Sequence, residues 1–131
     1  MGYGDLKTKI VYQELSYEIV GSVFEVYNSI GYGYPEKYYQ KAVASVFKTK
    51  NINFKEQVAY NLKLNGEIIA RNYLDFLVED KVIVELKQGN HFSKNFLDQV
   101  KKYLKITDLK LAILVNFTSS GVKFLRVLNI N

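Results

Sequence analysis

Three charged side chains in an otherwise apolar stretch are the first candidates for chemistry. Asp75, Glu85 and Lys87 interrupt the segment 73–87, which is otherwise rich in β-branched, aromatic and aliphatic residues. Glu85 and Lys87 share one face of a predicted strand, because side chains alternate along it. Two carboxylates held side by side repel each other, and a divalent cation between them relieves that repulsion. The spacing therefore indicates a hard-metal site beside an ammonium group, or else a solvated hairpin face with a cross-strand salt bridge.

Whether Asp75 reaches Glu85 depends on the register of a predicted β-hairpin. The only polar turn in the stretch is Glu79-Asp80-Lys81, which we take as the loop. A three-residue loop pairs Val78 with Val82. The same register pairs Asp75 with Glu85, and paired residues lie on one side of the sheet. A two-residue loop would send the two carboxylates to opposite faces unless a bulge restored the register.

A third carboxylate, Glu36, lies in a predicted helix from about residue 35 to residue 48. Pro35 suits the first turn of a helix, and Glu36 suits the positive end of the helix dipole. Glu36 also stands one turn before the first residue of an apolar stripe, which consists of Tyr39, Val43, Val46 and Phe47. Two roles remain open: a glutamate that caps its own helix, or an acid that faces the two hairpin carboxylates.

The rest of the chain alternates between helical and strand periodicity. The other predicted elements are helices at 11–30 and 92–106 and strands at 54–64, 67–78, 109–117 and 122–128. Asn65-Gly66 is a strong hairpin signal between two of these strands, and Gly89-Asn90 ends the third strand. The order is helix, helix, three strands, helix, two strands. This order favours an α/β fold with a mixed β-sheet flanked by helices.

Length and composition exclude several classes of protein. The 131 residues fit a single domain, 1–131, and 48% hydrophobic with 24% charged residues is typical of a globular chain. The absence of cysteine excludes a thiol nucleophile or a disulfide framework, and the single His91 cannot form a histidine cluster. We therefore expect a reducing, cytoplasmic compartment. No stretch is long enough to span a bilayer, and residues 1–7 do not resemble a leader, so no membrane association is expected.

The charge balance favours an acidic partner. The formal net charge is +5, which attracts polyanions such as nucleic acids. The predicted helix at 92–106 carries four candidate contacts to a nucleic acid, namely Lys94, Lys101, Lys102 and Lys105. The alternative is a solvated helix face, which is the usual role of such a charge run.

Several sequence blocks, taken together, resemble a known family. They are Gly33-Tyr-Pro-Glu-Lys-Tyr-Tyr39, Leu74-Asp-Phe-Leu-Val78, Val82-Ile-Val-Glu-Leu-Lys87, Asp98-Gln-Val-Lys-Lys-Tyr-Leu104 and Leu114-Val-Asn-Phe117. In this order and spacing the chain resembles the GxxExxY proteins, a group within the PD-(D/E)xK nuclease superfamily, over about residues 11–127. The resemblance implies a core of helix, three-stranded meander, helix and strand, which agrees with the elements predicted from periodicity.

The resemblance also implies a metal site. Asp75 and Glu85 would bind Mg²⁺ or Mn²⁺, with the backbone carbonyl of Leu86 as a further ligand. Lys87 would position water or stabilise the charge of the pentavalent phosphate. Glu36 matches a helix glutamate that assists the metal in some branches of the superfamily.

Two further residues match a pair that supports the phosphate in that superfamily. Gln99 and Tyr103 stand one helical turn apart in the predicted helix at 92–106. One position departs from the superfamily pattern, since Leu74 rather than proline precedes Asp75.

The implied activity is metal-dependent hydrolysis of DNA phosphodiester bonds. The alternative is a non-catalytic module that binds nucleic acid or protein and retains only the nuclease fold. Enzymes that cut both strands of a duplex often act as dimers, so a homodimer is one arrangement that the sequence leaves open.

Overall fold

The computed structural model describes residues 11–129, and its elements follow the predicted order. They are α2 (Gln13–Ile30), α3 (Glu36–Thr49), β1 (Phe54–Leu64), β2 (Glu67–Val78), β3 (Val82–Gln88), α4 (Lys94–Thr107), β4 (Leu111–Thr118) and β5 (Gly121–Leu128). The predicted absence of a leader in residues 1–7 falls outside the described residues. No helix within the described part is long and apolar enough to cross a membrane.

Several element boundaries differ from the prediction by one or two residues, and two of these differences have clear local reasons. Helix α4 begins at Lys94 rather than residue 92, because Ser93 caps it: the Ser93 hydroxyl accepts a hydrogen bond from the Asn95 N–H at 3.1 Å. Strand β4 begins at Leu111 rather than residue 109, because Asp108 ends α4 in a left-handed conformation and the chain needs further residues to enter the sheet.

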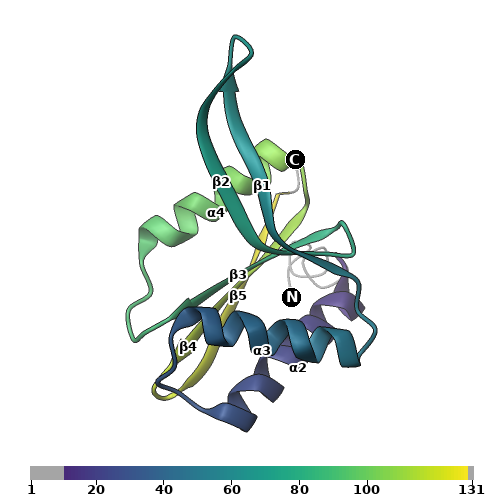
Figure 1. Cartoon of the computed structure of the whole chain (residues 1–131), viewed down its shortest axis with the longest axis vertical. Coiled ribbons are helices and arrows are strands. Elements are labelled where there is room, and N and C mark those ends of the chain that lie inside the picture. Colours follow the sequence, from purple (N-terminus) through teal and green to yellow (C-terminus); the bar gives the residue numbers. More distant parts are fainter. Residues whose placement is uncertain (1–10, 130–131) are drawn as a thin grey trace, which may run out of the picture.

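The five strands form one mixed sheet in the order β1-β2-β3-β4-β5. All neighbouring pairs are antiparallel except β3 and β4, which are parallel and joined through α4. Helices α2 and α3 cover one face of the sheet, and α4 covers the other (Figure 1). This architecture confirms the predicted α/β fold and matches the order of a PD-(D/E)xK nuclease-like sheet.

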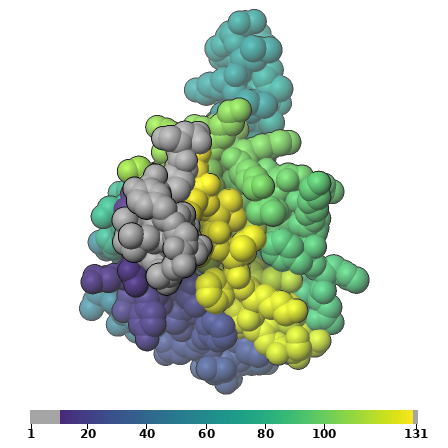
Figure 2. Space-filling view, turned by 180° about the vertical axis from the view of Figure 1, so that it is seen from behind, coloured from purple at the N-terminus to yellow at the C-terminus, as the bar shows by residue number. Residues whose placement is uncertain are grey.

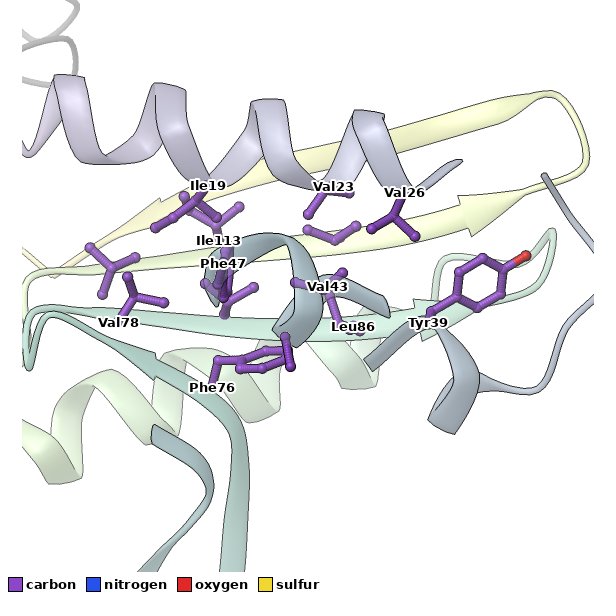
Figure 3. Packing of buried hydrophobic residues seen from close by; sticks show 14 of the residues in the cluster. Ile19, Val23, Val26, Tyr39, Val43, Phe47, Phe76, Val78, Leu86 and Ile113 are labelled. Carbon is purple, nitrogen blue, oxygen red and sulfur yellow. The ribbon is translucent and has the colours of Figure 1, made fainter. Parts of the chain in front are cut away.

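The core is divided by the sheet into two apolar clusters. On the side of α2 and α3, Ile19, Val43 and Phe47 pack against strand residues such as Phe76 and Leu86 (Figure 3). On the α4 side the cluster is formed by Leu74, Ile83, Phe96, Val100, Tyr103, Leu104, Ala112, Leu114 and Val127. Strands β3 and β4 are buried on both faces, which explains their nearly continuous apolar sequences. Each fully buried aliphatic or aromatic side chain adds roughly 1.5–3 kcal/mol to this core.

The β2–β3 loop has the predicted length. Val78 pairs with Val82, so the loop contains three residues, and the Lys81 N–H donates to the Val78 carbonyl at 2.9 Å. Glu79 and Asp80 adopt left-handed backbone angles, which allows so short a connection. The Asp80 carboxylate also forms an ion pair with Lys55 of β1 at 3.0 Å. These contacts hold the register that the sequence predicted.

The outer parts of β1 and β2 form an arm that projects beyond the helices (Figures 1 and 2). At the base of the arm the strand pairing skips Gln57 and Asp75, and Gln57 has a left-handed φ of 48°. Phe76 packs in the cluster beneath α2 and α3, whereas Leu74 packs in the cluster beneath α4. The ribbon therefore twists sharply at Asp75, where the arm leaves the domain.

Candidate active site

Asp75 occupies the point where β2 separates from β3. The pairing between these strands ends at Phe76 and Val84, and one further step in that register sets Asp75 beside Glu85. There the Leu86 N–H donates to Asp75 Oδ2 at 2.8 Å. If the strand pairing had continued, the Leu86 N–H would have bonded to the backbone of β2. The Asp75 carboxylate accepts this N–H instead, and the hydrogen bond holds Asp75 against β3.

Two glutamines that the sequence did not single out extend this contact. Gln57 Nε2 lies 3.4 Å from Asp75 Oδ1 and 3.0 Å from Gln40 Oε1. Gln57 therefore links the irregular position of β1 to both Asp75 and α3. No motif could have indicated this role, because it depends on a break in strand pairing and on residues 17 and 18 positions from Gln57.

Glu85 is the most strongly perturbed acid of the site. Its residue is only 6% exposed, and its Oε1 has no hydrogen-bond partner among the described residues. Burial, followed by the charge of Asp75 and a hydrogen bond with the Asp75 side chain, raises the pKa of Glu85 from 4.5 to about 10; Lys87 opposes this shift. Glu85 therefore keeps its proton at neutral pH. This burial contradicts the alternative of a solvated hairpin face.

The raised pKa predicts that Glu85→Gln stabilises the metal-free protein at alkaline pH. The folded state retains a proton that the unfolded state releases above pH 4.5, so the stability contributed by protonated Glu85 is full below pH 4.5 and is lost progressively up to about pH 10. Glutamine mimics the protonated acid at every pH. We expect the variant to match the parent near pH 4.5 and to exceed its free energy of unfolding by roughly 2–4 kcal/mol at pH 8.

Urea unfolding in the presence of chelator, repeated between pH 4.5 and pH 9, measures this difference. Glu56→Gln, an exposed change on β1, is the matched control and should follow the parent curve. A constant difference in the free energy of unfolding between Glu85→Gln and the parent across this range would contradict a buried proton on Glu85.

Glu36 lies at the start of α3 and is half-buried. Burial raises the pKa of Glu36, the charge of Lys87 lowers it, and the charge of Asp75 raises it. These interactions place Glu36 within electrostatic reach of the hairpin residues, and no side-chain hydrogen bond caps the described start of α3. Within residues 11–129, however, no three Asp, Glu, His or Cys side chains converge on a point that could hold one ion. The structure thus brings Asp75 and Glu85 together. Glu36 is near enough to interact with Asp75 electrostatically but does not form a three-ligand metal site with the two carboxylates.

Lys87 follows Glu85 on β3 and reaches toward the start of α4. Its residue is exposed, and its Nζ lies 5.0 Å from the centre of the Phe96 ring. On the neighbouring strand it pairs with Asn116, which is 2% exposed and whose Oδ1 has no hydrogen-bond partner in the described part of the chain. Asn116 belongs to the last sequence block, but only the parallel pairing of β3 with β4 reveals that it adjoins Lys87.

Apart from Leu86 on β3, the remaining predicted site residues all lie on α4. Tyr103 is 5% exposed and packs edge-on against Tyr60 at the base of the arm, with ring centres 4.5 Å apart. Gln99 is exposed one turn earlier. The four predicted contacts to nucleic acid, Lys94, Lys101, Lys102 and Lys105, are also exposed. Tyr103 thus helps to build the core beneath α4, and the role of the pair beside a phosphate stays a prediction.

The donor set fits a hard divalent cation. Asp75 and Glu85 supply carboxylate oxygens side by side, and the Glu85 Oε1 atom is buried without a partner, which is costly unless a cation or proton compensates it. Leu86, which lies between Glu85 and Lys87 in the sequence, is buried, and its N–H donates to Asp75. The predicted use of its carbonyl as a ligand stays a prediction.

Comparison with known proteins bears on this geometry. A family model described as the PD-(D/E)XK nuclease superfamily matches residues 13–127. A solved structure titled "Crystal structure of SSO0001" is similar with a TM-score of 0.56 and 17% sequence identity, over 73% of this chain and 51% of that one. The chain thus spans about half the length of this structure, and at such identity the likeness concerns the fold alone. No curated protein matches the chain.

Proposed function

Because the chain belongs to the PD-(D/E)XK nuclease superfamily, we propose that it hydrolyses DNA phosphodiester bonds at a site formed by Asp75, Glu85 and Lys87. The observation that carries the proposal is the buried carboxyl pair of Asp75 and Glu85, with an orphaned oxygen, directly beside an exposed lysine. Such an arrangement is costly for stability and is expected where function requires it. Within the superfamily, the block from Gly33 to Tyr39 supports placement among the GxxExxY proteins.

Asp75 and Glu85 would hold a divalent cation, Mg²⁺ or Mn²⁺, with the Leu86 carbonyl as a further ligand. Bound there, the cation would lower the pKa of a water molecule and offset charge on the phosphate. The chain keeps Asp75 in place through the Leu86 N–H and Gln57, so one ligand is positioned before any cation arrives. The proton on Glu85 must leave when a cation binds, so cation affinity should rise with pH.

Lys87 and Glu36 would act on the substrate phosphate and the attacking water rather than as the main ligands of the cation. The Lys87 ammonium is exposed and close enough to lower the pKa of both Glu36 and Glu85, so it can approach a phosphate at the same place. Its charge would stabilise the phosphate as negative charge develops on it. Glu36, half-buried and held in electrostatic contact with Lys87, would orient that lysine or an attacking water.

The charge distribution supports DNA as the substrate. The exposed lysines of α4 and the net charge of +5 would attract the phosphate backbone without regard to sequence. Figure 1 shows the carboxyl end of β3 and the starts of α3 and α4 on the same side of the molecule. Gln99 on α4 would contact the phosphate there. From the sequence we also expect that the protein is cytoplasmic and that it can act as a homodimer.

A non-catalytic module is the second candidate, and one observation favours it. No third acidic, histidine or cysteine ligand joins Asp75 and Glu85 within the described residues, so cation affinity rests on two carboxylates and backbone. A chain that binds DNA without cutting it would need neither the cation nor Lys87.

The proposal is tested by incubating the protein with single-stranded, duplex and branched DNA and with single-stranded RNA, each with Mg²⁺, Mn²⁺ or chelator. We expect cleavage of DNA with either cation and none with chelator. Binding of DNA at low salt without cleavage under any condition would favour the non-catalytic module, and the absence of both would overturn either reading.

A further inference from the structure

A hollow lies between the end of α2 and the start of α3. It has a volume of about 520 Å³ and is lined by Ile30, Tyr34, Tyr38, Lys41 and Ala42. Both tyrosines are conspicuously exposed for aromatic residues, Tyr34 by 40% and Tyr38 by 52%. Neither the carboxyl pair nor Lys87 uses this surface.

The two tyrosines form a pre-arranged aromatic surface. Their rings stack at 6.1 Å with planes 27° apart, and Tyr34 also meets the buried Tyr39 edge-on at 6.3 Å. Tyr39 is itself anchored, because its ring stacks on Phe117 at 4.1 Å and its hydroxyl donates to the Gly31 carbonyl at 2.7 Å. The core therefore holds Tyr34 in place while one side of the pair stays open to solvent.

The charge around this pair suits an anion that carries an aromatic group. Lys37 Nζ lies 5.9 Å from the centre of the Tyr38 ring, and Lys41 lines the hollow. An aromatic surface flanked by two ammonium groups is complementary to a nucleotide, whose base stacks and whose phosphate is negative. A purely apolar ligand would not interact favourably with the lysine charges, and a free phosphate would not stack on the rings.

The hollow is also close to the proposed reaction centre along the chain. Tyr34 precedes Glu36 by two residues, so their Cα atoms lie within about 7.6 Å. Glu36 in turn is in electrostatic contact with Asp75 and Lys87. Tyr38 and Lys41 lie on the opposite side of α3 from Glu36, because a helical turn takes about 3.6 residues. A strand whose phosphate lies beside Lys87 would therefore cross the start of α3 to place a nearby nucleotide on the tyrosines.

We propose that Tyr34 and Tyr38 bind an unpaired base of the DNA strand, with Lys37 and Lys41 contacting its backbone. This inference rests on the proposed function for the identity of the strand, and it adds a substrate preference. The faces of a base in a duplex are covered by its neighbours, so only an unpaired base can stack on the rings. The protein should therefore prefer single-stranded or branched DNA with unpaired nucleotides beside the cut.

The test measures binding apart from cleavage. A single-stranded oligonucleotide with 2-aminopurine at successive positions is titrated with protein in chelator, and its fluorescence and affinity are compared between the parent, Tyr38→Leu and Tyr34→Leu/Tyr38→Leu. Stacking on tyrosine should quench the parent complex. We expect the double variant to lose the quenching and to bind the single strand roughly tenfold or more weakly, with unchanged affinity for blunt duplex.

Tyr17→Leu is the matched control, because Tyr17 is 79% exposed on α2 and belongs to neither site. Thermal melting verifies that each variant is folded. Equal quenching and affinity in the parent and the double variant, or an equal loss in Tyr17→Leu, would overturn the inference. A parent that binds and quenches but never cuts would refute the proposed hydrolysis and leave the base-binding site standing.

Discussion

Replacing Asp75 with asparagine is expected to abolish DNA cleavage while preserving the fold. The asparagine carbonyl can still accept the Leu86 N–H, which the carboxylate accepts at 2.8 Å in the parent. The variant therefore keeps the contact that ties β2 to β3 but lacks the negative charge that would hold a cation. Loss of the several kcal/mol that a cation contributes to the transition state corresponds to a fall in turnover of roughly 10³-fold or more.

Initial rates at saturating DNA and Mg²⁺, together with Mn²⁺ binding by calorimetry, measure both parts of this expectation. Asp80→Asn provides the matched control, because Asp80 is an exposed carboxylate in the adjacent loop, where it forms an ion pair with Lys55. It should cut and bind Mn²⁺ like the parent. Cleavage by Asp75→Asn at the parental rate would remove Asp75 from the mechanism.

Lys87→Ala is expected to lower turnover by roughly 10²-fold or more while leaving DNA affinity nearly unchanged. The charge of Lys87 acts beside the carboxyl pair, as its effect on the pKa of Glu36 and Glu85 shows, so its benefit should be concentrated in the transition state. The change removes a contact with Phe96, worth about 0.5–1 kcal/mol, and the attraction of Lys87 to Glu36 and Glu85, so the fold should persist.

The comparison with Lys102→Ala separates chemistry from binding. Lys102 is exposed on α4, where it would add attraction to phosphate regardless of sequence. Its removal should weaken binding and flatten the dependence of affinity on salt, while cleavage at saturating DNA survives. If Lys87→Ala instead cuts as fast as the parent, or only loosens binding as Lys102→Ala does, the assigned mechanism is wrong and the non-catalytic module takes its place.

The local periodicity of the chain determined most of the fold. Apolar residues at helical spacing predicted α2, α3 and α4, and the predicted strands 54–64 and 67–78 coincide with β1 and β2. The three-residue loop between Val78 and Val82 could also be predicted, because hairpin register depends on residues close in sequence. The strand pairing itself ends at Phe76 and Val84, and one further step in that register places Asp75 beside Glu85.

Tertiary structure decided how the candidate site works. The depth at which Glu85 is buried depends on α4 and β4, so its raised pKa could not be derived from the hairpin alone. Gln57 reaches Asp75 only because β1 is irregular there, and Asn116 adjoins Lys87 only because β3 and β4 run parallel. Spacing along the chain records the period of each element, whereas burial and contacts between distant residues arise only when the elements pack together.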